Sequence, residues 1–188
     1  MSMDLRERKT KRAIKDAFLQ LRAKKPLERI TVKELAELAE ISKATFYLHY
    51  RDVYDLSEQL QNEVIQDILG AVLADATALT DMAQMAKKLY IAFCSHQHLI
   101  DILFSGNQAA ALSGSIERGI KDCIYRKKPE TKEDALFQVL LSYQIQGGYY
   151  AYAQNHKQLG DERVLAILDQ ISAILKDFPA LEAASDSK

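Results

Sequence analysis

The chain has 188 residues, 48% of them apolar and 27% charged, and its formal net charge at pH 7 is −1. These values are typical of a soluble globular protein of one or two domains. The two cysteines, Cys94 and Cys123, lack C-x-x-C or zinc-finger spacing, which argues against a disulfide framework and a structural metal. No apolar window approaches the roughly 18 residues of a membrane span. The composition therefore predicts a cytoplasmic protein with no metal site, no cofactor and no membrane partner.

The charge is unevenly distributed along the chain. Residues 1–51 carry 13 Lys and Arg against 7 Asp and Glu, a balance of +6, whereas residues 52–188 carry 12 against 19, a balance of −7. A basic front predicts that the first quarter of the chain meets a polyanion. The alternative is a chance cluster of charges on a solvated surface.

Apolar residues recur at spacings of 3 and 4, and Gly and Pro are scarce, so the pattern predicts an all-α protein. We expect a first helix over residues 5–24 that ends ahead of Pro26. Thr31, with Glu34 three residues later, has the spacing of a capping box at the start of a second helix. Ser42 caps a third helix that continues to Tyr50. Later helices are expected at about 53–76, 81–97, 99–104, 108–127, 132–155 and 161–177.

The second and third helices are separated by only Glu40 and Ile41, which is the spacing of a helix-turn-helix motif. Phe46 and Tyr50 are expected to hold the third helix against the first, so that its outer face is left in solvent. That face presents a cationic amine, hydroxyls, an imidazole and a methyl group, which suit phosphate oxygens, base edges and thymine methyls in a major groove. The presented residues are Lys43, Ala44, Thr45, Tyr47 and His49.

Residues 30–56, "ITVKELAELAEISKATFYLHYRDVYDL", resemble the DNA-binding signature of TetR-type (TetR/AcrR-like) transcriptional regulators. The resemblance covers about residues 5–68, and it implies DNA binding as a homodimer. By this resemblance the DNA contacts are Thr31, Lys33, Lys43, Ala44, Thr45, Tyr47, His49 and Arg51. Glu40 replaces the family's usual turn glycine, and Val53 stands where the family often has lysine. Part of the stretch also resembles LacI-type headpieces, but a helical segment precedes the motif here and no alternating apolar run predicts a sheet.

The resemblance implies two domains: a three-helix DNA-binding domain over residues 1–51, and a larger helical effector-binding and dimerisation domain over residues 52–188. Two late segments have the 3 and 4 spacing of a helix-bundle seam. The residues expected at a dimer interface are Leu136, Leu140, Tyr143, Gly147, Val164, Leu168, Ile171 and Leu175. Gly147 and Gly148 suggest that another helix backbone crosses there. The alternative is a packing face within one chain.

Aromatic residues with polar tips in the second domain are suited to a pocket for a small apolar or aromatic effector, or equally to an ordinary helical core. The candidates are Tyr90, Phe93, His96, Phe104, Tyr143, Gln146 and Tyr150.

No nucleophile elbow, phosphate loop or paired metal motif is present, so the sequence predicts no enzyme. Three hypotheses follow. They are a homodimeric repressor released from a palindromic operator by an effector, a regulator of the same build that acts without a ligand or through a protein partner, and a helical interaction protein.

Overall fold

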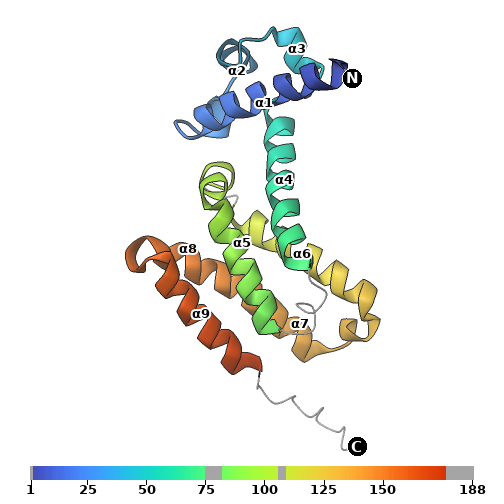
Figure 1. Ribbon diagram of the computed structural model, residues 1–188, viewed down its shortest axis with the longest axis vertical. Coiled ribbons are helices and arrows are strands. Elements are labelled where there is room, and N and C mark those ends of the chain that lie inside the picture. The colour runs from blue at the N-terminus through green and yellow to red at the C-terminus, as the bar shows by residue number, and fades with distance from the viewer. Residues whose placement is uncertain (1, 75–81, 106–108, 177–188) are drawn as a thin grey trace, which may run out of the picture. The chain divides into compact units, whose positions relative to one another are not determined.

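The computed structural model describes residues 2–74, 82–105 and 109–176, and all regular structure in these ranges is helical, which confirms the all-α prediction (Figure 1). The described helices are α1 (Ser2–Arg22), α2 (Val32–Leu38), α3 (Lys43–Tyr47), α4 (Val53–Leu73), α5 (Met82–Leu103), α6 (Ala109–Lys127), α7 (Ala135–Ser142), α8 (Gly148–Leu159) and α9 (Asp161–Lys176). Short 3-10 turns occur at Leu27–Arg29 and Pro129–Lys132. Within the described ranges, no helix is both long enough and apolar enough to cross a membrane.

The chain divides into two compact units. The N-terminal unit contains Met1–Val64 together with His98–Gln108, and the C-terminal unit contains Ile65–Gln97 together with Ala109–Lys188. Two helices, α4 and α5, therefore contribute residues to both units.

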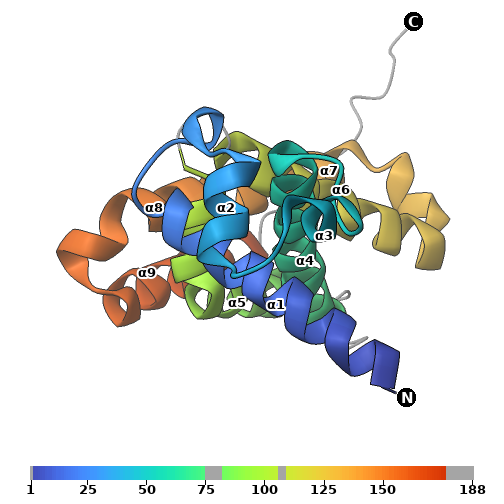
Figure 2. The same ribbon diagram turned by 90° about the horizontal axis from the view of Figure 1, so that it is seen from above.

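The core of the N-terminal unit forms where the apolar stripe of α1 meets α2, α3 and the start of α4 (Figure 2). Ile14 and Phe18 of α1 are fully buried, as are Leu35, Phe46 and Leu56 from the three other helices. Burying a side chain of this size contributes about 1.5–3 kcal/mol, so this small unit depends on a few residues.

Polar contacts join the N-terminal unit at its edges. The Lys15 ammonium lies 2.7 Å from the Glu63 carboxylate and joins α1 to α4. Gln61 Nε2 donates a 2.8 Å hydrogen bond to the carbonyl of Leu103, the last residue of α5. Arg22 Nη2 donates to Ser105 Oγ at 2.8 Å, so the end of α1 is also tied to the segment that follows α5.

Two helix ends in this unit differ from those expected. The first helix ends at Arg22 rather than at residue 24. The third helix ends at Tyr47 rather than at Tyr50, because the backbone tightens there: His49 N–H donates to the carbonyl of Phe46 at 2.9 Å, three residues back. Tyr50 is nevertheless 7% exposed and packs beside Phe46, as predicted.

The prediction of separate helices at 81–97 and 99–104 was wrong. The described part of this region is one helix, α5, from Met82 to Leu103. The residues around 98 include neither glycine nor proline, so nothing interrupts the backbone hydrogen bonds. Residues 76, 81, 108 and 177, where four of the expected helices begin or end, lie outside the described residues.

The helix expected at 132–155 begins and ends later and is not uniform. Asp134 caps α7 by accepting a 2.9 Å hydrogen bond from the backbone N–H of Phe137. The segment Tyr143–Gly147 is a π-helix, and α8 continues from it to Leu159. π-Helical turns inside α-helices are rare, and those that occur are often found at functional sites.

The reason for Gly148 differs from the one expected. A Cβ atom added at Gly148 would lie 2.2 Å from the phenol oxygen of Tyr90, so the tyrosine ring of α5, not a crossing helix backbone, requires the glycine. The Tyr90 hydroxyl donates to the carbonyl of Gln144 at 3.4 Å, within the π-helix. Gly147, by contrast, is exposed and has Tyr143 as its nearest neighbour, 4.0 Å from an added Cβ.

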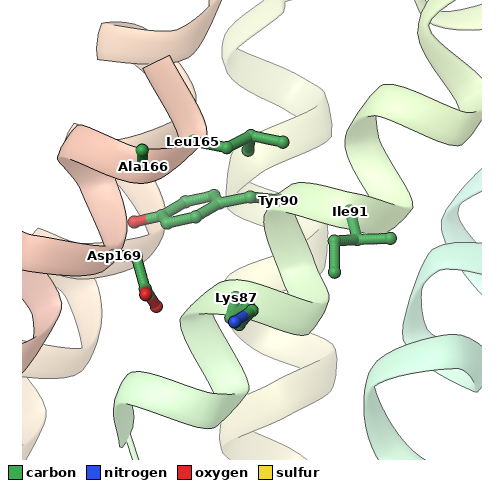
Figure 3. A pocket seen from close by; sticks show the side chains of 6 residues that line it. All are labelled: Lys87, Tyr90, Ile91, Leu165, Ala166 and Asp169. Carbon is green, nitrogen blue, oxygen red and sulfur yellow. The ribbon is translucent and has the colours of Figure 1, made fainter. Parts of the chain in front are cut away.

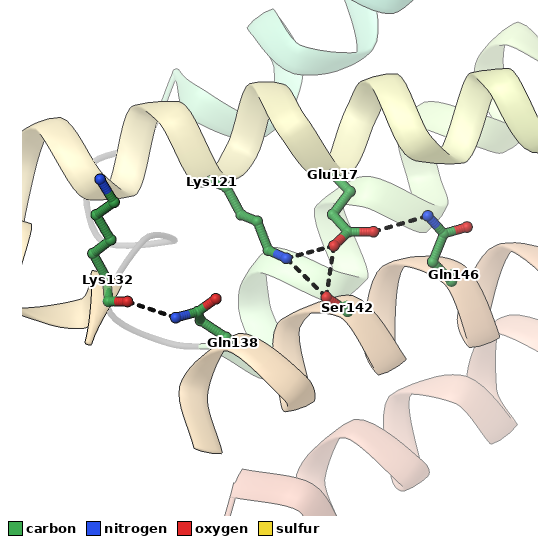
Figure 4. Close-up of polar contacts among 6 residues, drawn as sticks. All are labelled: Glu117, Lys121, Lys132, Gln138, Ser142 and Gln146. Atoms are coloured by element: carbon green, nitrogen blue, oxygen red, sulfur yellow. Dashed lines mark hydrogen bonds and ion pairs between the residues drawn. The ribbon is translucent and has the colours of Figure 1, made fainter. Parts of the chain in front are cut away.

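A polar cluster joins α6 to α7 and the π-helix (Figure 4). One oxygen of the Glu117 carboxylate accepts from Lys121 Nζ and from Ser142 Oγ, each at 2.6 Å, and the other accepts from Gln146 Nε2 at 2.8 Å. Burial raises the pKa of Glu117, but these donors outweigh it and lower the pKa to about 2. The carboxylate is thus held in its charged form.

Candidate nucleic-acid interface

The start of α2 is fixed by the capping box that the sequence predicted. The backbone N–H of Glu34 donates to Thr31 Oγ1 at 3.3 Å, and the backbone N–H of Thr31 donates to the Glu34 carboxylate at 3.1 Å. Lys25 Nζ lies 2.7 Å from the same carboxylate, and its hydrogen bond, followed by those from Thr31, lowers the pKa of Glu34. Lys33 is exposed beside this cap, and its ammonium lies 3.9 Å from the Glu37 carboxylate.

The turn between α2 and α3 keeps a left-handed residue. Glu40 has φ 55°, and it is the one described residue other than glycine with a positive φ. A side chain in this conformation costs on the order of 1 kcal/mol. The turn is closed by a 2.9 Å hydrogen bond from the N–H of Ile41 to the carbonyl of Ala36. The chain therefore forms the compact turn although it has glutamate in place of glycine, and the backbone of Glu40 is strained as a result.

Helix α3 buries one face and exposes the other. Ser42 Oγ accepts a 3.0 Å hydrogen bond from the N–H of Thr45 and caps the helix, while Phe46 is fully buried. Tyr47 is 57% exposed, and its ring meets the edge of Phe46 at a centroid distance of 5.5 Å. The internal contact orients a tyrosine whose outer surface is left in solvent.

The remaining residues expected on this face differ in exposure. Lys43 and Ala44 are exposed, and among the described residues Lys43 has no ion-pair partner. Thr45 is half-buried, and its hydroxyl lies 2.8 Å from Ser42 Oγ, so part of its hydrogen-bonding capacity is used within the chain. His49 is half-buried beside Tyr50.

The start of α4 holds the last of the expected contacts. The backbone N–H of Arg51 donates to the Asp55 carboxylate at 2.8 Å, and this bond is the main cause of the lowered pKa of Asp55. The Arg51 guanidinium lies 3.4 Å from the same carboxylate but its side chain is 82% exposed. Val53, which replaces the lysine that the family often has, is 6% exposed and packs inward. Arg51 is thus the exposed cation at this helix start.

The residues expected at a dimer interface fall on two faces. Val164 and Leu168 are buried within the chain, whereas Ile171 is 40% exposed and Tyr143 is 60% exposed. Leu136, Leu140 and Leu175 are half-buried, and Gly147 is exposed. The structure adds the exposed apolar residues Val139, Ile167 and Ile174, which the sequence did not single out, and Tyr150, which was expected at the effector pocket, is exposed as well. They belong to α7, α8 and α9, and α8 and α9 lie side by side (Figure 1).

The seven residues expected at an effector pocket are not gathered in one place. Tyr90 and Phe93 are buried, with Phe93 5.1 Å from the ring of Tyr149, but Tyr143 and Tyr150 face solvent. Gln146 belongs to the Glu117 cluster, and His96 is half-buried with its Nδ1 2.9 Å from the carbonyl of Ala92. Phe104 is buried in the N-terminal unit. Of the seven, Tyr90 lines a pocket between α5 and α9.

Comparison with solved structures identifies the architecture. The fold matches a protein from Shewanella sp. PV-4 assigned to the TetR family of transcription regulators, with a TM-score of 0.63 and 19% identity over 92% of this chain and 99% of that one. The chain has the TetR-type fold. It also resembles the fatty acid degradation regulator FadR from Bacillus halodurans, with a TM-score of 0.55 and 12% identity over 92% of this chain and 97% of that one.

Sequence similarity covers less of the chain than the TetR-type fold does. A curated relative, the uncharacterized HTH-type transcriptional regulator YxbF of Bacillus subtilis (strain 168), is 36% identical over 78 residues. These residues make up 40% of this chain and 20% of YxbF, so the match spans about a fifth of that relative. No family model matches the chain.

Proposed function

We propose that the protein is a sequence-specific DNA-binding transcription regulator that acts as a homodimer, a repressor released from a palindromic operator by a small-molecule effector. The observation that carries the proposal is the exposed face of α3. There Lys43, Ala44 and Tyr47 are exposed, while Phe46 holds the helix from behind. An amine, a methyl group and a phenol are groups that contact phosphates and base edges in a major groove.

The charges near this face support a nucleic-acid partner. In the proposed complex, Thr31, Lys33 and Arg51 contact phosphates, and Lys43, Ala44, Thr45 and Tyr47 enter the groove. His49 is a further candidate for a phosphate contact. Lys33 lies near the Glu37 carboxylate of its own helix, and such an exposed pair is weak enough to be exchanged for phosphate. Arg51 lies just before α4, and its side chain is 82% exposed although its guanidinium is near the Asp55 carboxylate.

The homodimer is supported by apolar surface in the C-terminal unit. Tyr143 and Tyr150 are 60% and 67% exposed, and Ile174 on α9 is 72% exposed. Large apolar side chains gathered on neighbouring helices mark surfaces that associate. A two-fold dimer places two copies of α3 on the two halves of a palindromic site.

The first experiment is selection of bound duplexes from a random DNA library with purified protein. We expect an enriched palindrome whose affinity falls steeply with salt, because phosphate contacts release counterions. A folded dimeric protein that enriches no sequence would favour an interaction protein instead. Release of the selected duplex by a small molecule would separate an effector-controlled regulator from one that acts through a protein partner or without a ligand.

The matched variants are Tyr47→Ala and Tyr54→Ala. Both tyrosines are 57% exposed in the N-terminal unit, but only Tyr47 belongs to α3. We expect Tyr47→Ala to abolish specific binding while the protein stays dimeric, and Tyr54→Ala to bind the selected duplex with much smaller loss. Equal affinity of the Tyr47 variant and the unmodified protein would refute the assigned face.

A further inference from the structure

A pocket of about 300 Å³ lies between α5 and α9 in the C-terminal unit (Figure 3). Its lining residues are Lys87, Tyr90, Ile91, Leu165, Ala166 and Asp169. This volume is at the lower end of the range for small-molecule sites. The pocket is therefore suited to a compact ligand of a few hundred daltons or less.

The apolar floor of the pocket is held in place. Tyr90 is 3% exposed, and its hydroxyl hydrogen-bonds to the buried Ser172 of α9 and to the carbonyl of Gln144. Burial raises the pKa of this phenol, so it stays neutral at physiological pH. Ala166 contributes only a methyl group to the wall. A fixed aromatic floor beside aliphatic walls favours a ligand with an apolar portion.

Two opposite charges complete the lining. Lys87 and Asp169 are both exposed, and among the described residues neither has an ion-pair or hydrogen-bond partner. Figure 3 shows both charged residues on the same side of the Tyr90 ring, Lys87 on α5 and Asp169 on α9, whereas Ile91 lies farther from α9. An uncommitted cation and an uncommitted anion on one side of the ring in an apolar pocket match a ligand whose head carries both charges.

We propose that this pocket binds a free α-amino acid with an apolar side chain. The ligand carboxylate pairs with the Lys87 ammonium, the ligand ammonium pairs with the Asp169 carboxylate, and the side chain packs on Tyr90 beside Ile91 and Leu165. The regulatory meaning of the site rests on the proposed function, because an amino acid would then be the class of effector that controls DNA binding.

The path of α5 gives such a ligand a route to the DNA-binding unit. The helix runs from the pocket into the N-terminal unit, where the Leu103 carbonyl accepts from Gln61 of α4. Arg22 of α1 donates to Ser105 just beyond it. A ligand that bridges Lys87 and Asp169 joins α5 to α9, and it can control DNA binding if it binds the DNA-bound and free states of the protein with different affinity.

Calorimetric titration of the full chain tests the site with defined probes. The probes are L-phenylalanine and L-leucine, with 3-phenylpropionate, which lacks the ammonium group, and phenethylamine, which lacks the carboxylate, as comparators. We expect at least one amino acid to bind and each comparator to bind about tenfold more weakly or not at all, because each loses one charge-assisted contact. Comparators that bind as well as the amino acids, or no binding by either amino acid, would overturn the proposal.

Variants locate the binding. Lys87→Gln and Asp169→Asn each remove one charge, and Ala166→Phe fills the space at an exposed position where folding is not at stake. We expect each to weaken amino-acid binding about tenfold or more. The controls Lys157→Gln and Glu162→Gln make matching charge changes at exposed positions outside the pocket and should bind normally. Undiminished binding by all three pocket variants would place the ligand elsewhere.

The DNA assay separates this proposal from the proposed function. Amino-acid binding by a protein that selects no DNA sequence refutes the regulator and leaves the pocket in place. The other outcome is a protein that selects a duplex and binds the amino acid by calorimetry, but whose affinity for the duplex does not change when the amino acid is saturating. This result refutes the effector role alone.

Discussion

Replacing Glu117 with glutamine tests the polar cluster between α6 and the π-helix. The carboxylate accepts hydrogen bonds from Lys121, Ser142 and Gln146 at 2.6–2.8 Å, and its pKa falls from the ordinary 4.5 to about 2. At about 1.4 kcal/mol for each pKa unit, this difference corresponds to at most about 3.4 kcal/mol of stability. Because the side chain keeps 16% of its surface in solvent, we expect Glu117→Gln to lower the free energy of unfolding at pH 7 by about 2–3 kcal/mol.

The sign of the pH dependence follows from the lowered pKa. A carboxylate with a folded-state pKa below its unfolded value stabilises the fold fully above about pH 4.5, and it loses this contribution as the pH falls toward 2. By pH 3 roughly two fifths of the contribution remains. The difference between the unmodified protein and Glu117→Gln should therefore shrink as the solution is acidified from pH 5 to pH 3.

Urea unfolding followed by circular dichroism at pH 7, 5, 4 and 3 measures this difference. Glu58→Gln is the control, because Glu58 is an exposed carboxylate of α4. The free energy of unfolding of this variant should stay within about 0.5 kcal/mol of that of the unmodified protein. A destabilisation by Glu117→Gln that is the same at pH 7 and pH 3 would mean that the charge is not what the cluster stabilises. No destabilisation at pH 7 would refute the cluster itself.

Four further substitutions test individual features. Glu40→Gly should raise the free energy of unfolding by about 0.5–1 kcal/mol in thermal or urea unfolding, because relief of the left-handed strain exceeds the added chain entropy, whereas Glu40→Ala should not. Gln144→Met should stabilise the protein by about 1–2 kcal/mol, because both polar atoms of this buried amide lack partners among the described residues; a loss of stability would indicate a buried water. Tyr90→Phe should cost about 1 kcal/mol in the same unfolding measurement through loss of its hydrogen bonds. Lys43→Ala should weaken duplex binding by about 1–3 kcal/mol at one base position if the lysine contacts a base, and a loss independent of sequence would assign it to phosphate.

The N-terminal unit could be predicted closely because its signals are local. The capping box at Thr31, the cap at Ser42 and the short interval between them set the helix starts, and the apolar spacing set which faces are buried. The end of α3 was not predictable, because it depends on a tightened backbone bond at His49 rather than on a residue type. Glu40 stands where the resemblance has a turn glycine, and its left-handed backbone keeps the conformation expected of that turn.

The C-terminal unit was less predictable because its contacts join distant segments. A spacing of 3 and 4 fits either of two adjacent faces of α9, and only the fold distinguishes buried Leu168 from exposed Ile167. Lys87 and Asp169 lie more than 80 positions apart, and each alone is an ordinary surface charge. Gly147 and Gly148 indicated a close approach within the helix, but nothing local showed that Tyr90 makes it or that the backbone there is π-helical.

The contact between Tyr90 and Gly148 constrains how the chain can change over evolution. Any residue other than glycine at 148 would place a Cβ atom 2.2 Å from the phenol oxygen, so it requires a shorter side chain at 90 at the same time. Either change alone gives a clash or a cavity, and each is therefore selected against until the other is present. Among descendants of this gene, the residues at 90 and 148 should change together, and a lineage that has lost the tyrosine should be free to replace the glycine.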